Sequence, residues 1–103
     1  MIRLITRARM TRDYAKGLVA APIDPEPAVR KLLETVGAKL ISLYFPTGDS
    51  DILFIAETDD AESVIAGVLA AAAAGTMSDI STARAWTGAE FKAVAEKAST
   101  VAH

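Results

Sequence analysis

The stretch from Ala38 to Thr58 reads AKLISLYFPTGDSDILFIAET, and it determines most of what the sequence predicts about the fold. It holds two apolar segments, residues 39–45 and 52–58, on either side of a polar connection. Both segments are rich in β-branched and aromatic residues, which are typical of strands, while Pro46 and Gly48 are typical of turns. We therefore expect two strands joined by a tight turn.

A helix is expected before this pair of strands. Asp24 suits the N-cap, Pro25 the first helical position and Glu26 the first turn, where an acid faces the positive end of the helix dipole. Apolar residues then recur at the helical spacing i, i+3, i+4 and i+7, at Val29, Leu32, Leu33 and Val36. Gly37 suits the end of the helix.

The remaining elements follow from similar signals. Residues 59–62 resemble a capping box with Asp in place of Ser or Thr, and they open an Ala-rich helix that we expect to end near Gly75. Residues 76–86 carry β-formers and are expected to form a strand. Residues 87–90 form another capping box and predict a C-terminal helix.

At the N-terminus, residues 2–10 alternate as a strand does, whereas Gly17 and Pro22 within residues 11–23 indicate an irregular loop. The order is strand, helix, strand, strand, helix, strand, with one more helix at the end. It predicts an α+β, ferredoxin-like fold in one domain over residues 1–103: a four-stranded antiparallel sheet with two helices on one face. The first and third strands are expected in the middle.

Composition excludes several classes of function. The chain is 51% hydrophobic and 23% charged with a net charge of −2, so no basic surface for nucleic acid is expected. It has no cysteine, and its only histidine is His103, the last residue, which could belong to a purification tag. No apolar run approaches the length of about 20 residues that a membrane helix needs. We expect a cytoplasmic protein without a cofactor and without a membrane partner.

Both faces of the central strands are apolar, although helices are expected on only one face. By simple alternation, one face holds Ile41, Leu43, Phe45, Leu53 and Ile55, and the opposite face holds Leu40, Tyr44, Ile52 and Phe54. The sequence does not say which set faces the helices. Because an uncovered apolar face is typical of an interface, we predict a homodimer that packs sheet against sheet. Pairing of dimers into tetramers is left open.

The central region resembles the GYD-domain family. The matching features are the helix end LLETVGAKL, the strand ISLYF, the glycine turn, the strand ILFIAE and the acidic helix start, over about residues 29–87. That family usually has an aromatic residue before the turn aspartate, where this chain has Ser50 before Asp51. The resemblance implies a ferredoxin-like fold of the dimeric α/β-barrel type. It supplies no catalytic residue, because the family's biochemical role is not established.

The turn itself, Gly48, Asp49, Ser50 and Asp51, is a candidate site. Two acids two residues apart can bind a divalent cation or divide acid and base roles. Turn chemistry explains the same residues, since glycine allows positive φ and Asp and Ser side chains bond to nearby backbone. The further oxygen ligands of a calcium loop are missing from the sequence, and we expect no metal site.

Other charged and aromatic side chains give weaker candidates. Arg3, Arg7 and Arg9 share one face of the first strand, with Glu57 on the neighbouring strand. They either bind an anionic ligand or form cross-strand ion pairs, and we favour the pairs. The remaining candidates are Trp86 as a ligand contact, and Tyr14, Tyr44 and Arg84 as acid–base residues.

Three functions are therefore open. We favour a homodimeric module, leaning away from an enzyme, that holds a small apolar or anionic molecule between the sheet and the helices. The second is a cofactor-independent monooxygenase or isomerase, and the third is a subunit that docks onto another protein. A cleft of about 300 Å³ or more on which a tyrosine and an arginine converge would favour the enzyme.

Overall fold

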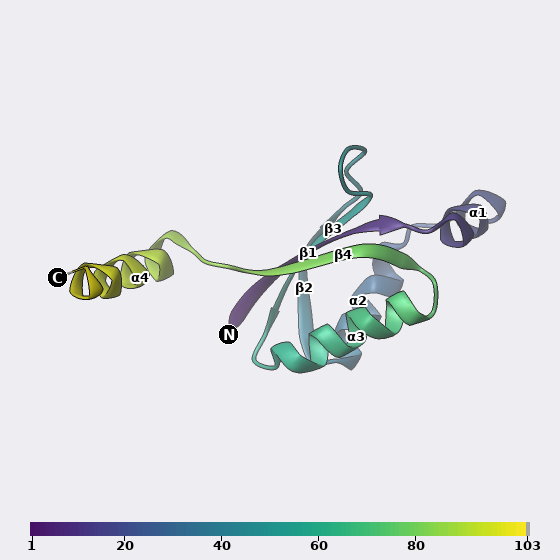
Figure 1. Cartoon of the computed structure of the whole chain (residues 1–103). Coiled ribbons are helices and arrows are strands. Elements are labelled where there is room, and N and C mark those ends of the chain that lie inside the picture. The colour runs from purple at the N-terminus through teal and green to yellow at the C-terminus, as the bar shows by residue number, and fades with distance from the viewer. Residues whose placement is uncertain (103) are drawn as a thin grey trace.

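A computed structural model of the chain describes residues 1–102, and it has the expected element order with one added helix (Figure 1). The elements are β1 (Ile2–Met10), α1 (Arg12–Ala20), α2 (Glu26–Thr35), β2 (Ala38–Tyr44), β3 (Ile52–Thr58), α3 (Ala61–Ala73), β4 (Met77–Ala85) and α4 (Gly88–Val101). The order confirms the α+β, ferredoxin-like arrangement. His103, whose origin the sequence leaves open, lies outside the described residues.

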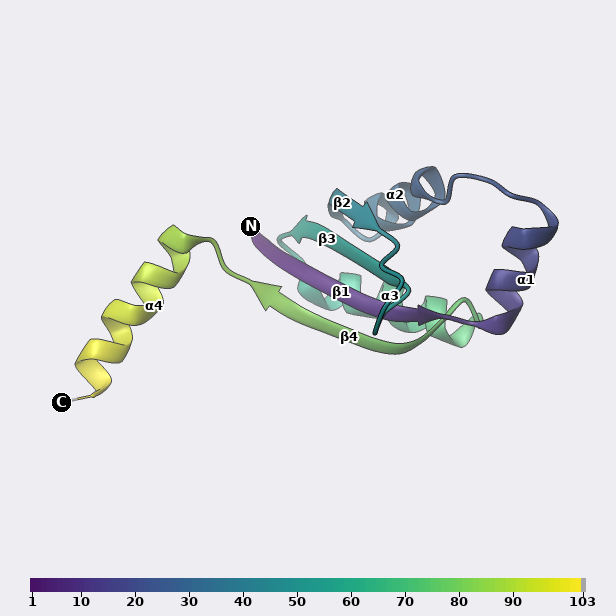
Figure 2. The same cartoon turned by 90° about the horizontal axis from the view of Figure 1, so that it is seen from above.

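The sheet is antiparallel with strand order β2-β3-β1-β4, so that β1 and β3 are central as expected. The helices α2 and α3 lie side by side on one face of the sheet, and the described chain leaves the other face open (Figures 1 and 2). We call this second surface the open face.

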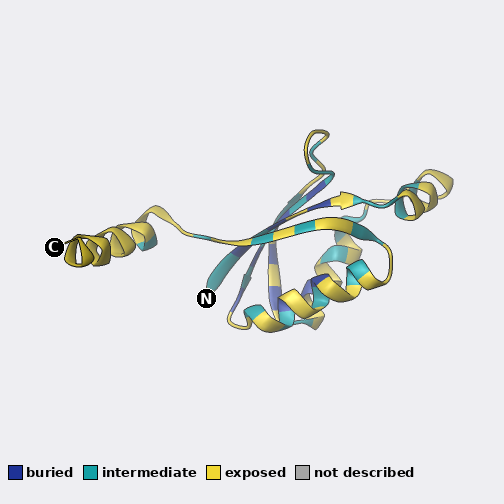
Figure 3. Ribbon diagram, viewed as in Figure 1, coloured by how far each residue is buried: buried dark blue, intermediate teal, exposed yellow. Residues whose placement is uncertain are grey.

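Burial is concentrated between the sheet and these two helices (Figure 3). Leu4 of β1 lies next to Ala56 of β3, and both are buried. Leu33 of α2 and Val64 and Val68 of α3 belong to the same core cluster as these two strand residues. Every second residue of β3 therefore faces the helices, and the residues between them face the open side.

A β-bulge interrupts the alternation in β2. Leu40 pairs with Ala56, but the next pair is Ser42 with Ile55. Two residues of β2, Ile41 and Ser42, therefore oppose the single residue Ile55, as in a bulge. The sequence contains no glycine or proline at this point that would have indicated it.

The bulge reverses the expected sides for the end of β2. Leu43 pairs with the buried Phe54 and packs against the core on the helix side, while Tyr44 pairs with Leu53 on the open face. Phe45 also lies on the helix side. The two expected face sets are therefore wrong for these three positions of β2, because simple alternation assumes a regular strand.

Residues 12–20 of the loop predicted over residues 11–23 form the helix α1, whereas residues 21–23 are irregular as expected. The first turn of α1 is capped by Thr11, whose side chain accepts a hydrogen bond from the backbone N–H of Tyr14 at 3.2 Å. None of its residues is buried, and it stands at the end of β1, away from the other helices (Figure 2). The loop prediction was wrong for this segment because Gly17, taken as a breaker, lies inside the helix.

Two helix starts differ by one residue from expectation. The helix α2 begins at Glu26 and its N-cap is Pro25, so the expected positions of Asp24 as N-cap and Pro25 as first helical residue are wrong by one. The Asp24 carboxylate, one residue before the N-cap, accepts the N–H of Glu26 at 3.0 Å. In α3 the N-cap is Asp60, which accepts from Ser63. The capping box placed at residues 59–62 is therefore wrong by one position.

The expected capping box of α4 is confirmed. The Thr87 side chain accepts from the Glu90 backbone at 3.1 Å, and the Glu90 carboxylate accepts from the Thr87 backbone at 2.8 Å. None of the residues of α4 is buried, because the helix extends away from the sheet beyond the end of β4 (Figures 1 and 3). The described chain is accordingly long and narrow, 59 × 28 × 21 Å.

Candidate functional site

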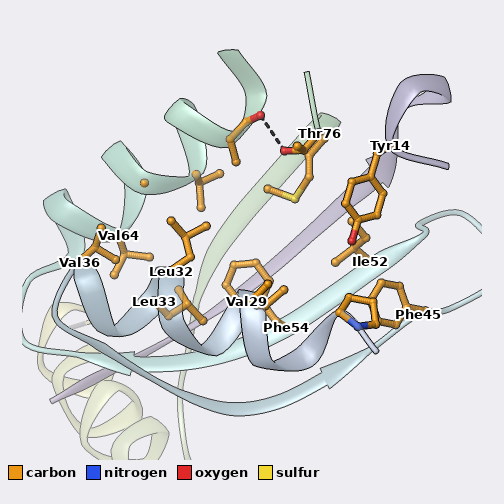
Figure 4. A pocket seen from close by; sticks show the side chains of 16 residues that line it. Tyr14, Val29, Leu32, Leu33, Val36, Phe45, Ile52, Phe54, Val64 and Thr76 are labelled. Carbon is orange, nitrogen blue, oxygen red and sulfur yellow. Dashed lines mark hydrogen bonds between the residues drawn. The ribbon is translucent and has the colours of Figure 1, made fainter. Parts of the chain in front are cut away.

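An apolar cleft of about 210 Å³ lies between α2, α3 and the sheet (Figure 4). Leu33 of α2 and Val64 of α3 form parts of its walls, and Ile52 and Phe54 of β3 form its floor. These residues come together because both helices bury one apolar stripe against the same face of the sheet. The other lining residues are Tyr14, Pro25, Ala28, Val29, Leu32, Val36, Phe45, Gly67, Val68, Ala71, Thr76 and Met77.

One end of the cleft is closed by a close approach of the two helices. A Cβ atom added at Gly67 of α3 would lie 3.1 Å from Cγ1 of Val36, just beyond α2. Such a distance is shorter than ordinary van der Waals contact, so only glycine allows this spacing without a shift of its neighbour. At the other end the cleft reaches Tyr14 and Phe45 (Figure 4).

Very few polar atoms face the cleft. The hydroxyl of Thr76 is already used, since it donates to the carbonyl of Ala71 at 2.8 Å (Figure 4). The Tyr14 hydroxyl points toward Ile52 and makes no hydrogen bond with any other residue from 1 to 102 (Figure 4). It is therefore available to bond with one polar atom of a bound molecule.

The structure does not bring the three acid–base candidates together. Tyr14 lines the cleft, whereas Tyr44 is 63% exposed on the open face. Arg84 lies near the end of β4, and its guanidinium carbon is 3.7 Å from the centre of the Trp86 ring. Trp86 is accordingly a cation–π partner of Arg84, and both residues lie outside the lining of the cleft.

Two of the arginines of β1 are engaged in the fold. Arg3 donates to Glu57 across the strands at 3.0 Å. Arg9 donates to the carbonyl of Asp49 at 3.0 Å and lies 3.8 Å from the carboxylate of Asp51. Arg7 is exposed on the open face and forms no ion pair with the other described residues. Arg3 and Arg9 thus form ion pairs, and none of these three arginines of β1 is among the described residues that line the cleft.

The Gly48–Asp51 turn is held against the end of β1. The carboxylate of Asp51 accepts the backbone N–H of Met10 at 3.0 Å, and the N–H of Asp51 donates to the carbonyl of Ala8 at 2.9 Å. Within residues 1–102 no three histidine or acidic side chains gather as a metal site requires. The contacts of the turn are those of a structural connection.

Two carboxyl groups have a lowered pKa, and both are helix caps. Hydrogen bonds from the side chain and backbone of Ser63 lower the pKa of Asp60. The pKa of Glu90 is lowered by hydrogen bonds from the backbone and side chain of Thr87. Helix capping accounts for both, so neither shift marks a catalytic group.

The sequence analysis expected a ligand between the sheet and the helices, but it did not identify several residues that line the cleft, because the lining comes from segments far apart in the chain. The apolar stripe of α2 and the strand residues were identified as core residues, but Ala71 and Thr76 were not singled out. The one local signal was Gly67, a glycine in the middle of an apolar helix pattern. Such a glycine commonly marks a close packing contact.

The fold and the cleft define a small α+β protein of ferredoxin-like topology with an apolar site between sheet and helices. The model of the GYD domain family matches residues 4–95, and the chain belongs to that family. This confirms the resemblance seen around the central strands. No curated protein and no solved structure matches the chain. None of the helices in residues 1–102 is both long and apolar enough to cross a membrane.

Proposed function

We propose that the protein is a homodimeric binding module that holds one small apolar molecule in the cleft between α2 and α3. The observation that carries this proposal is the lining of the cleft, in which no charged side chain of the described residues takes part. An apolar cavity of about 150 Å³ can hold benzene. A cleft of about 210 Å³ therefore suits a molecule somewhat larger than one aromatic ring.

The chemistry of the lining favours an apolar over an anionic ligand. Moving a charge from water into this cleft would cost several kcal/mol, because no arginine or lysine among the described residues lines it. The free hydroxyl of Tyr14 supplies one hydrogen bond. A ligand with an apolar body and a single hydroxyl or carbonyl oxygen fits both features.

The enzyme alternative receives less support from the geometry. The cleft is smaller than about 300 Å³, and no arginine of the described residues lines it together with Tyr14. Arg84, the candidate partner, stacks on Trp86 instead. Binding without turnover is the function that these contacts support best.

The open face supports the homodimer. Ile5, Leu53 and Ile55 are only half-buried there, and next to them Tyr44 and Ile41 are 63% and 41% exposed. An apolar surface on the uncovered side of a sheet is stabilised when a second layer covers it. A second copy of the chain can cover the open face, because two identical faces can pack against each other about a two-fold axis.

The ligand proposal is tested with 2-naphthol and its charged analogue 2-naphthalenesulfonate, followed by fluorescence titration. We expect saturable binding of 2-naphthol and at least tenfold weaker binding of the sulfonate. Tyr14→Phe should weaken 2-naphthol roughly two- to tenfold, the worth of one hydrogen bond, and leave naphthalene unchanged. Equal binding of both probes, or binding of neither, would overturn the proposal.

A matched pair of variants locates the site. Ala71 lines the cleft, whereas the adjacent Ala70 is exposed and does not. Ala71→Phe should fill the cleft and reduce 2-naphthol affinity at least tenfold, while Ala70→Phe should bind as the unchanged protein does. Similar loss in both variants would place the binding elsewhere.

The homodimer is tested by sedimentation equilibrium at micromolar concentration. We expect twice the chain mass of 10.8 kDa. The variant Ile55→Lys, on the open face, should give monomers. The control variant Leu69→Lys should remain dimeric, because Leu69 lies on α3 and its side chain is 68% exposed. A monomeric unchanged protein would contradict the homodimer.

A further inference from the structure

A second β-bulge interrupts the pairing of β1 with the edge strand β4. On one side of the bulge Arg7 pairs with Ser81, and on the other side Arg9 pairs with Ser78. One residue of β1 therefore lies opposite two residues of β4, at positions 79–80. Bulges of this kind can redirect a side chain from one face of a sheet to the other.

Asp79, within this bulge, has an unusual backbone conformation. Its φ is 49°, and no other non-glycine residue from 1 to 102 has a positive φ. This left-handed region is uncommon for residues with a side chain, although aspartate adopts it more readily than most. Because the Asp79 side chain is exposed, its own packing does not account for the conformation. Unfavourable backbone conformations persist where the surrounding structure holds them, and they are found most often at functional sites.

The bulge decides which side of the sheet Met77 faces. Ser81 pairs with Arg7, whose side chain is exposed on the open face. In a regular strand Met77 would face the same side as Ser81, because the two residues are four positions apart. With the extra residue, Met77 instead pairs with Met10, which lies on the same side of β1 as the buried Ala8. Met77 thus faces the helices and lines the cleft.

The chemistry of Met77 favours an aromatic ligand. Contact between a methionine sulfur and an aromatic ring is worth roughly two- to tenfold in affinity. The rings of Tyr14, Phe45 and Phe54 line the same cleft. Stacked or edge-to-face contacts between aromatic rings are favourable beyond the area that they bury. A sulfur and three rings together favour a planar aromatic ligand over a saturated one of the same size.

We propose, on the basis of the binding function proposed above, that Asp79 is a positioning residue of the ligand site. The bulge at Asp79 directs the thioether of Met77 onto the ring of an aromatic ligand. Met77 then determines the preference for an aromatic over a saturated ligand. The Asp79 carboxylate takes no part in binding, and only the backbone conformation at this position matters.

NMR of the methionine methyl groups tests the contact between Met77 and the ligand. The chain has 3 methionines, and the variant Met77→Leu identifies the Met77 signal by its absence. Saturation with 2-naphthol should shift this signal by ring current and should leave the signal of Met1, which is 75% exposed, unchanged. Met77→Leu should weaken 2-naphthol binding roughly two- to tenfold and leave binding of the saturated analogue decahydro-2-naphthol unchanged.

Deletion of Asp79 tests the role of the bulge. A regular β4 would place Met77 on the open face and Ser78 on the helix side. The shortened protein should lose 2-naphthol affinity as Met77→Leu does, and its Met77 signal should no longer respond. Exchange of the two residues, Met77→Ser with Ser78→Met, should restore the methionine response in the shortened chain. In the full-length chain the same exchange should abolish that response.

Two substitutions keep the test decisive if the shortened chain does not fold. Asp79→Gly allows a positive φ and should bind 2-naphthol as the unchanged protein does. The β-branched side chain in Asp79→Val disfavours a positive φ and should weaken binding. Equal binding by these two variants, or a Met77 signal that does not respond while 2-naphthol binds, would overturn the inference alone. If the unchanged protein does not bind 2-naphthol, the proposed function fails and this inference fails with it.

Discussion

Gly67 of α3 lies so close to Val36 that a Cβ atom at position 67 would be 3.1 Å from Cγ1 of Val36. This approach fixes the spacing of α2 and α3 at the closed end of the cleft. A glycine inside a helix normally costs about 0.5–1 kcal/mol relative to alanine. Here the cost is offset by the packing that the missing side chain allows.

Substitution of Gly67 tests this contact. Gly67→Ala should change the free energy of unfolding by less than about 1 kcal/mol, because the gain in helix propensity is offset by displacement of Val36. Gly67→Val should destabilise by about 1–3 kcal/mol. Urea denaturation measures both. If Gly67→Ala stabilised by the full propensity gain, the helices would be less tightly packed than the structure shows.

The role of the acidic turn is tested by removing each carboxylate in turn. Asp51→Ala should destabilise the protein by about 1–2 kcal/mol, because its carboxylate accepts the Met10 N–H at 3.0 Å. Asp49 uses its backbone carbonyl toward Arg9, so Asp49→Ala should stay within about 0.5 kcal/mol of the unchanged protein. Equal effects in thermal unfolding would contradict this assignment.

The stability of α4 should depend on pH through Glu90. Because hydrogen bonds from Thr87 lower the Glu90 pKa in the folded state, its capping contribution is complete above the ordinary glutamate pKa of about 4.3. It is lost as the pH falls through the lower folded pKa. NMR chemical shifts of α4 should therefore show fraying in this acidic range.

The variant Glu90→Gln is the control for that titration, since an amide can also accept the Thr87 N–H but does not titrate. Its α4 signals should lack the acidic transition of the unchanged protein. If both proteins frayed over the same pH range, another group would be responsible.

A half-buried pair of hydroxyl groups joins β1 to β4. The side-chain oxygens of Thr6, which is buried, and Thr82 are 2.9 Å apart. Thr6→Val should cost about 1 kcal/mol, and so should Thr82→Val, but the double variant should cost less than the sum. Additive effects in chemical denaturation would show that the two hydroxyls do not interact.

Most of the fold could be predicted from local sequence patterns such as helix caps and glycines at helix ends. Thr87 and Glu90 form the capping box that their spacing predicts, and Gly37 has a positive φ of 77° just after α2. The element order then leaves few topologies, because crossovers are right-handed. Strands, the main helices and the sheet order were therefore predictable.

The errors arose where tertiary contacts override local pattern. Thr11 caps α1 and also donates hydrogen bonds to the carbonyls of Gly75 and Thr76. The periodicity of the sequence does not indicate such long-range hydrogen bonds. The bulge at Ile41 and Ser42 likewise depends on pairing with β3. One extra residue was enough to exchange the sides of Leu43 and Tyr44.

The position of the cleft between the sheet and the helices was predicted, but its shape was not, for a related reason. The shape of the cleft depends on the angle at which α2 and α3 diverge, starting from the contact between Val36 and Gly67. That angle is set by side chains packing from both helices, which no single segment encodes.

A titration of the isotope-labelled protein with 2-naphthol, followed by two-dimensional NMR, tests the ligand site most directly. We predict saturable shift changes concentrated at Tyr14, Val29, Ala71 and Thr76, which line the cleft. Residues of the open face such as Leu53 should move little. Changes confined to the open face, or none at saturating probe, would contradict the proposal that this cleft is a binding site.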